Sequence, residues 1–269
     1  MTNLRMTCIA RAAAVAILVS SAAPPVDAQT IASRVAQVRE GKVRLTFASR
    51  PEVCGSGSWF SSSDRNSRLS WSPDASPDVI YDDECRHTPV RVVLTLESGR
   101  VSKLETYVGG RWRPADSEVT DLGIVGVKDA TDYLLGLAAS DGQAGRNAIL
   151  PATLADSVVV WPRLLSIARD ERRPRQTRSQ ARFWLGQAAA DRVFPSQGRL
   201  ARRGSDEDEI KKSAVFALSQ RRNEEAISAL IAIARRNRDP EVRKSALFWL
   251  GQTTDSRALD LFEEILRRD

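Results

Sequence analysis

The stretch Ser213-Ala-Val-Phe-Ala-Leu-Ser-Gln220 returns 32 positions later as Ser245-Ala-Leu-Phe-Trp-Leu-Gly-Gln252. A third copy, Ala181-Arg-Phe-Trp-Leu-Gly-Gln187, stands 33 positions before the corresponding Ala214. The segments that follow two of the copies, 226–236 and 258–268, also match at a spacing of 32. A fixed period in the low thirties that contains two helical patterns predicts stacked pairs of helices.

The residues in front of the last copy allow a comparison with a known family. A turn that opens Asp239-Pro-Glu-Val-Arg-Lys244 leads into an Ala-rich helix that ends in Leu-Gly, and this pattern resembles the HEAT repeat. It is most similar to the HEAT-like repeats of phycobilisome lyases. Clear copies cover 174–268, and a weaker version reaches back to 129. The resemblance implies an α-solenoid fold. For function it implies only a scaffold, which is how this family is mostly used, because a fold does not determine a specific function.

The expected fold class is therefore mainly α: an α-solenoid of HEAT-like helix pairs over 129–269, preceded by a small antiparallel β subdomain over 29–120. Within the subdomain, 42–47 alternates between apolar and polar residues, as a half-buried strand does. Two further strands, 90–96 and 101–108, flank the turn at Ser98-Gly99 and predict a hairpin.

The first 28 residues have the pattern of a secretory signal peptide. Arg5 and Arg11 precede the apolar run 12–19, and Val26-Asp-Ala28 supplies small residues for cleavage before Gln29. An uncleaved anchor is the alternative. No later run approaches 18 apolar residues, so no membrane span is expected after cleavage. We expect an exported protein, periplasmic or secreted.

Two cysteines, Cys54 and Cys85, follow this leader. In an oxidising compartment a pair of cysteines is expected to form a disulfide, here one that closes a polar loop. A redox or metal site is the alternative. Four tetrahedral zinc ligands would need carboxylates in addition to His87, which is the single histidine of the chain.

The sequence offers no pattern that would support catalysis. There is no Gly-x-Ser-x-Gly, no His-Glu-x-x-His and no phosphate loop, and the His-Glu pairs of the di-iron hydroxylase in the HEAT-like family are missing. Asp82-Asp83-Glu84 lacks the spacing of a calcium loop and is interpreted as a solvated turn. We expect no enzyme activity, no metal and no cofactor.

The repeats align three phenylalanines, Phe183, Phe216 and Phe248, at a position that is often exposed on the concave face of HEAT-like repeats. Trp184 and Trp249 stand where the family usually has alanine. These five residues are the candidate partner-binding site, a groove for a peptide or helix of another protein. The alternative is that the rings fill the space between repeats as core.

A second candidate surface is basic. The net charge is +6, and the segment 169–203 holds ten arginines against three acids. Arg178 matches the HEAT position whose side chain commonly bonds acidic turn residues. The loop arginines form the candidate basic surface: Arg172, Arg173, Arg175, Arg199, Arg202 and Arg203. The expected function is a protein–protein interaction scaffold of the cell envelope; the alternative is a binder of an anionic polymer or nucleic acid through 169–203. The acidic run 206–209 and the leader disfavour nucleic acid.

Overall fold

The computed structural model describes residues 30–58, 60–62, 68–69, 78–82, 84, 86–87, 89–193, 206–221 and 224–268. The expected leader, 1–28, lies outside the described residues. The helices are α1 (Ile31–Val35), α2 (Val127–Leu137), α3 (Gly142–Asn147), α4 (Ile149–Thr153), α5 (Trp161–Arg169), α6 (Arg175–Val193), α7 (Asp206–Ser219), α8 (Glu224–Arg236), α9 (Pro240–Gly251) and α10 (Ser256–Arg267). The strands are β1 (Gly41–Phe47), β2 (Val53–Gly55), β3 (Phe60–Ser62), β4 (Arg68–Leu69), β5 (Val79–Ile80), β6 (Arg86–His87), β7 (Val90–Glu97), β8 (Arg100–Val108), β9 (Arg111–Trp112) and β10 (Val119–Ile124).

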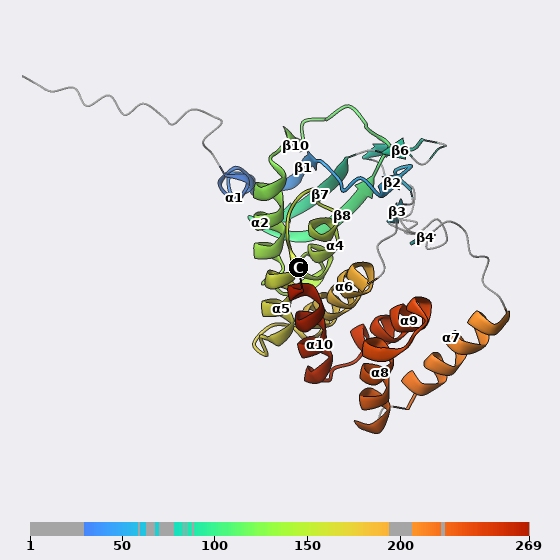
Figure 1. The fold of residues 1–269 in the computed structure, drawn as a ribbon. Helices are drawn as coiled ribbons and strands as arrows, with labels where there is room; N and C mark the ends of the chain where they lie inside the picture. The colour runs from blue at the N-terminus through green and yellow to red at the C-terminus, as the bar shows by residue number, and fades with distance from the viewer. Residues whose placement is uncertain are drawn as a thin grey trace, which may run out of the picture.

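The main sheet has four strands in the order β10-β1-β7-β8 (Figure 1). The strands β1, β7 and β8 pair antiparallel as the alternating pattern predicts, but β10 pairs with β1 in parallel. At the start of β1, Gly41 adopts a φ of +106° and a Cβ there would lie 2.6 Å from the carbonyl oxygen of Glu118. Glycine is therefore required at the point where the two parallel strands meet.

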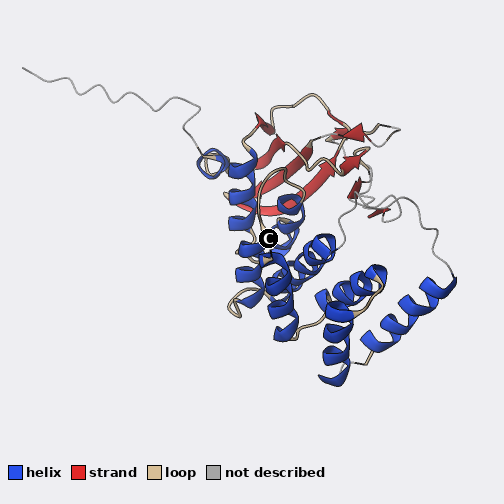
Figure 2. Cartoon of the chain, in the orientation of Figure 1, coloured by secondary structure: helices blue, strands red, loops and turns tan. Residues whose placement is uncertain are grey.

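Each face of the sheet is covered differently (Figure 2). Alternate residues such as Leu45, Val92 and Leu104 are buried in a core that also contains residues of α2, α4, α6 and α10. On the opposite face, β5 and β9 form a small ribbon over Val93 and Tyr107. The strand region and the helices thus share one continuous apolar core. The bounds 29–120 and 129–269 for separate folding units remain a prediction.

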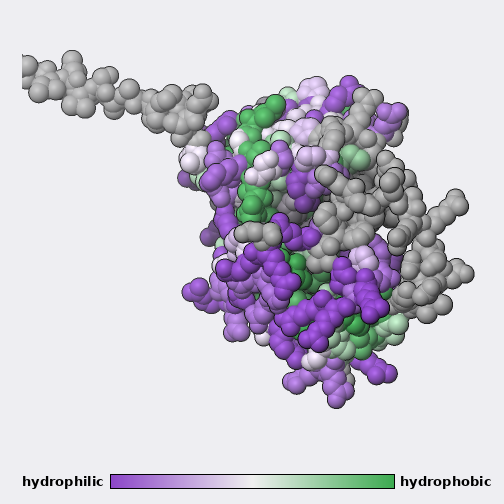
Figure 3. All heavy atoms as spheres, in the orientation of Figure 1, coloured by the Kyte–Doolittle hydropathy of each residue, from purple (hydrophilic) through white to green (hydrophobic). Residues whose placement is uncertain are grey.

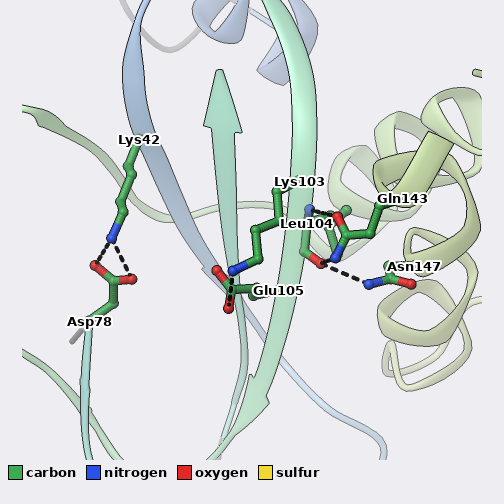
Figure 4. A network of polar contacts seen from close by, with 7 residues as sticks. All are labelled: Lys42, Asp78, Lys103, Leu104, Glu105, Gln143 and Asn147. Carbon is green, nitrogen blue, oxygen red and sulfur yellow. Dashed lines mark hydrogen bonds and ion pairs between the residues drawn. The ribbon is translucent and has the colours of Figure 1, made fainter. Parts of the chain in front are cut away.

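The edge strand β8 is capped by side chains of α3 (Figure 4). The backbone N–H of Leu104 donates to Oε1 of Gln143 at 2.9 Å. The carbonyl oxygen of Leu104 accepts from Nε2 of Gln143 at 3.4 Å and from Nδ2 of Asn147 at 3.1 Å. An unpaired strand edge can template pairing with another chain, so these amides both satisfy the backbone and protect the edge.

The expected fold class is wrong in two respects. The structure combines a mixed four-stranded sheet in the N-terminal half with helices, rather than a small antiparallel subdomain ahead of an all-helical array. The helices α2 to α4, which the sequence analysis interpreted as weak repeats, belong to the core formed with this sheet and continue no regular stack. The helix α3 packs on β8, and residues of α2 and α4 share the buried core with the strands, which local helical periodicity cannot indicate.

The second departure concerns the order of the helices in the C-terminal half. A solenoid that stacks in sequence would place α7 between α6 and α9. Instead α9 packs against α6 on one side and against α7 and α8 on the other, while α10 packs against α5, α6 and α8 (Figure 1). The last helix pair is therefore inserted between the two earlier pairs, and the arrangement is not plainly a solenoid.

Short-range signals nevertheless set the helix ends as the repeat pattern predicts. Asp239 caps α9 by accepting a hydrogen bond at 2.9 Å from the backbone N–H of Glu241, and Pro240 takes the first helical position. Asp255 caps α10 in the same way, accepting from the N–H of Arg257 at 2.9 Å. Among the described residues, no helix is long and apolar enough to cross a membrane.

Candidate functional site

The aromatic residues singled out in the repeats form a continuous row across three helices, which we call the aromatic row: Phe183, Trp184, Phe248, Trp249 and Phe216. Phe183 of α6 meets Phe248 of α9 edge to face, with ring centroids 6.1 Å apart. Trp249 of α9 meets Phe216 of α7 at 5.0 Å with the planes tilted by 48°. The structure thus brings together side chains that are 33 to 65 positions apart in the sequence.

Neighbouring rings on the same helix complete the aromatic row. Phe183 and Trp184 lie 5.0 Å apart, and so do Phe248 and Trp249, in both cases edge to face. Edge-to-face geometry places the positive ring edge against the negative ring face and stabilises each pair by about 0.5–1.5 kcal/mol beyond burial. Four of the five side chains are partly buried, whereas Phe216 is 46% exposed at the α7 end.

Two glycines set the spacing of α6 and α9 beneath the aromatic row. A Cβ on Gly186 would lie 3.1 Å from both the Cα of Gly251 and the carbonyl oxygen of Leu247. The corresponding position of α7 is Ser219, which has a side chain where the other two copies have none. This difference offers a physical reason why α6 packs against α9 rather than against α7, since backbones can approach most closely where both helices carry glycine.

Ion pairs join the helices around this contact. Arg169 of α5 reaches Asp260 and Glu263 of α10 at 2.8 Å each. Arg235 of α8 bonds Glu264 of α10 at 2.6 Å, and the charges of Arg267 and Arg169 keep the pKa of Glu263 below its usual value through hydrogen bonds. Such pairs at the surface contribute little stability individually, but they specify which helices meet.

The arginines of the candidate basic surface differ in their surroundings. Arg172 and Arg173 both contact the carboxylate of Asp170, at 3.1 and 3.3 Å. The hydrogen bond from Arg172 holds the pKa of Asp170 below its usual value. Arg175 is exposed and has no ion pair within the described part of the chain. Arg199, Arg202 and Arg203 lie outside the described residues.

One buried arginine was not singled out by the sequence analysis. Arg182 of α6 is only 5% exposed, and its Nε has no hydrogen-bond partner among the described residues. Burial lowers the pKa of its guanidinium, and the charges of Arg178 and Arg175 lower it further. Arg178 was expected to bond acidic turn residues as in HEAT repeats, but its Nε is also buried, with no partner in the part of the chain that the structure describes. The equivalent Arg243 bonds turn carbonyls instead, donating to Asn237 at 2.7 Å.

The expected disulfide stays a prediction, because Cys85 lies outside the described residues. Cys54 is in β2 and stands opposite His87 of β6 in the strand register. Among the described residues, no three His, Cys, Asp or Glu side chains gather as a metal site.

The C-terminal part of the chain matches a known family of repeats. Residues 196–269 match HEAT repeats, which covers α7 to α10. The match supports a HEAT-like repeat protein in this part of the chain, and HEAT repeats are generally protein–protein interaction motifs. The comparison with curated proteins and that with solved structures each gave no match.

Proposed function

We propose that the protein is a non-enzymatic scaffold that binds another protein or peptide along the aromatic row. The observation that carries this proposal is the exposure of Phe216, which ends the row at the surface of α7. Ala217, the next residue of the same helix, is exposed as well. Figure 3 shows an apolar area where α7 and α8 meet, with hydrophilic residues to its left and below it.

An exposed ring that is backed by four others suits a partner with apolar side chains. The ring of Trp249, whose centroid lies 5.0 Å away, restricts the orientation of Phe216, so less side-chain entropy is lost when a partner covers it. Aromatic side chains dominate the energetics of protein interfaces for this reason and because each buries a large area. The proposed partner therefore presents an amphipathic helix or an extended apolar segment to α7 and α9.

The compartment belongs to the same proposal. The charged and apolar segments of residues 1–28 and the two cysteines support export to the cell envelope or beyond. A partner would then be a protein of the same compartment.

Site-specific crosslinking tests the proposal directly. A photoreactive phenylalanine analogue at position 216 should crosslink a discrete partner in an envelope extract. The matched control is the analogue at Ile124, which is 87% exposed on β10 and far from the repeats in sequence. In a pull-down from the same extract without crosslinking, Phe216→Ser should abolish capture of the same partner, while Ile124→Ser should not. Equal capture by both serine variants, once each is shown to fold by circular dichroism, would refute the proposal.

A further inference from the structure

Three arginines of α6 lie along one side of the first half of the helix: Arg175, Arg178 and Arg182. At 100° per residue they fall within an arc of about 60°, and they span about 10 Å along the helix axis. Arg175 is exposed, Arg178 is partly buried and Arg182 is 5% exposed, so the row of positive charges leads from the surface inward. We call these residues the arginine stripe.

Nothing in the described part of the chain neutralises the arginine stripe. The first turn of α6 contains no acidic residue, and the positive end of the helix dipole adds to the same field. Glu171, the nearest acid in the sequence, is exposed and forms no ion pair with these arginines in the described part of the chain. Asp170 beside it already bonds Arg172 and Arg173. Burial lowers the pKa of Arg182, and the positive charges of Arg178 and Arg175 lower this pKa further.

Several polar atoms around the arginine stripe are buried without a hydrogen-bond partner. Two of them, Nε of Arg182 and Nε of Arg178, belong to the stripe itself, and two more, Nη1 of Arg173 and Oγ1 of Thr177, belong to neighbouring residues of the chain; none has a partner among the described residues. A buried donor that lacks a partner costs about 1–3 kcal/mol, and more when it is charged, so native proteins rarely keep several such donors unpaired. These donors and charges require an acceptor that carries several negative charges.

We propose that the arginine stripe binds a phosphate group, free or as part of a phosphorylated or pyrophosphate compound. A tetrahedral oxyanion offers three or four acceptor oxygens and at least two negative charges, which suits donors arriving from several guanidiniums. A single carboxylate would leave most of these nitrogens unsatisfied. Arg175 captures the anion at the surface, and Arg178 and Arg182 hold it.

Calorimetric titration with inorganic pyrophosphate and with phosphate, in chloride buffer of matched ionic strength, tests this site in the full chain. Saturable binding is expected. At a hundredfold excess over Kd the midpoint of thermal unfolding should rise by about 5–10 °C. Arg178→Met should weaken binding about 10- to 100-fold, the range expected for the loss of charge-assisted hydrogen bonds.

Arg172→Met is the matched control, because Arg172 is 92% exposed and bonded to Asp170. Phosphate stabilises many proteins by exclusion from their surface, and this control experiences the same general effect. A rise in the unfolding midpoint that is equal in the wild type, Arg178→Met and Arg172→Met would overturn the proposal. Tighter binding of citrate than of pyrophosphate would overturn the choice of phosphate over carboxylate.

The phosphate-free protein supplies a second measurement. A binding arginine held without its ligand destabilises the fold, so Arg182→Met should raise the unfolding midpoint while the response to pyrophosphate disappears. A purely structural arginine predicts a lower midpoint and an unchanged response. If Arg182→Met does not fold, the loss or retention of binding in Arg178→Met still decides the question.

Discussion

The contact between α6 and α9 can be tested by adding single methyl groups to its glycines. In Gly186→Ala the new Cβ would lie 3.1 Å from the Cα of Gly251 and from the carbonyl oxygen of Leu247, so the helix backbones must move apart by a few tenths of an ångström. Overpacking of this kind costs about 1–3 kcal/mol. Replacing glycine by alanine in a helix recovers about 1 kcal/mol. The expected net loss in the free energy of unfolding is about 1 kcal/mol.

Two other glycines provide graded comparisons. In Gly251→Ala the nearest atom, the carbonyl oxygen of Arg182, would lie at 3.3 Å, so the two effects should nearly cancel. In Gly136→Ala, near the end of α2, the new methyl would meet nothing within 4 Å. That variant should be stabilised by about 0.5 kcal/mol, because it gains helix propensity at no packing cost. The expected order of stability is Gly136→Ala, then Gly251→Ala, then Gly186→Ala.

Urea unfolding followed by circular dichroism at the helical band measures this order. The urea concentration at the midpoint should change, while the slope of the free energy of unfolding against urea concentration stays constant. A constant slope shows that the variants expose the same surface on unfolding and differ only in stability. The double variant Gly186→Ala/Gly251→Ala should depart from additivity by at least about 0.5 kcal/mol, since the two sites touch. If Gly186→Ala is as stabilising as Gly136→Ala, the two helices do not meet at these glycines and the inserted position of α9 is refuted.

Three further predictions follow from the structure. Burial raises the pKa of Tyr133 to about 12. The unfolded chain loses this proton near pH 10 and the folded chain only near pH 12, so the free energy of unfolding should fall by about 1–2 kcal/mol between these two pH values. Urea titrations of Tyr133→Phe should lack this part of the decline. Gln143→Ala removes both amide bonds to Leu104 and should cost about 1–2 kcal/mol and promote association in sedimentation experiments, whereas the exposed Gln180→Ala should do neither. Ending the chain at residue 237 should make α7 and α8 fully open to hydrogen exchange, because α9 connects them to α6; continued protection of α7 and α8 would indicate stacking in sequence order.

The local elements were predictable because their signals are local. The hairpin of β7 and β8 follows from alternation on both sides of Ser98-Gly99, and the helices α8 to α10 follow from the repeat. The strand β10 gave no such signal, since only Leu122 of its six residues is buried. Its parallel pairing with β1 joins segments about 75 positions apart, and such pairing depends on contacts that no short window contains.

The packing order of the repeats could not be predicted for a different reason. The three copies have nearly the same apolar pattern, so each presents a similar face and periodicity does not say which copy lies beside which. The choice depends on single positions such as Gly186, Ser219 and Gly251, where one atom decides how closely two backbones approach. Likewise the spacing of Arg175, Arg178 and Arg182 is visible in the sequence, but the burial of Arg182 is not.

The two proposed sites are separable although α6 contributes to both. Around that helix, Phe183 lies about 100° from Arg182, because consecutive residues differ by that angle. The exposed end of the aromatic row is on α7, whereas the arginine stripe is confined to the first half of α6. Phe216→Ser therefore changes no group near the arginines, and Arg178→Met changes none of the ring contacts. A protein partner lost in the first variant and a phosphate response lost in the second would be independent results, so the failure of one proposal leaves the other standing.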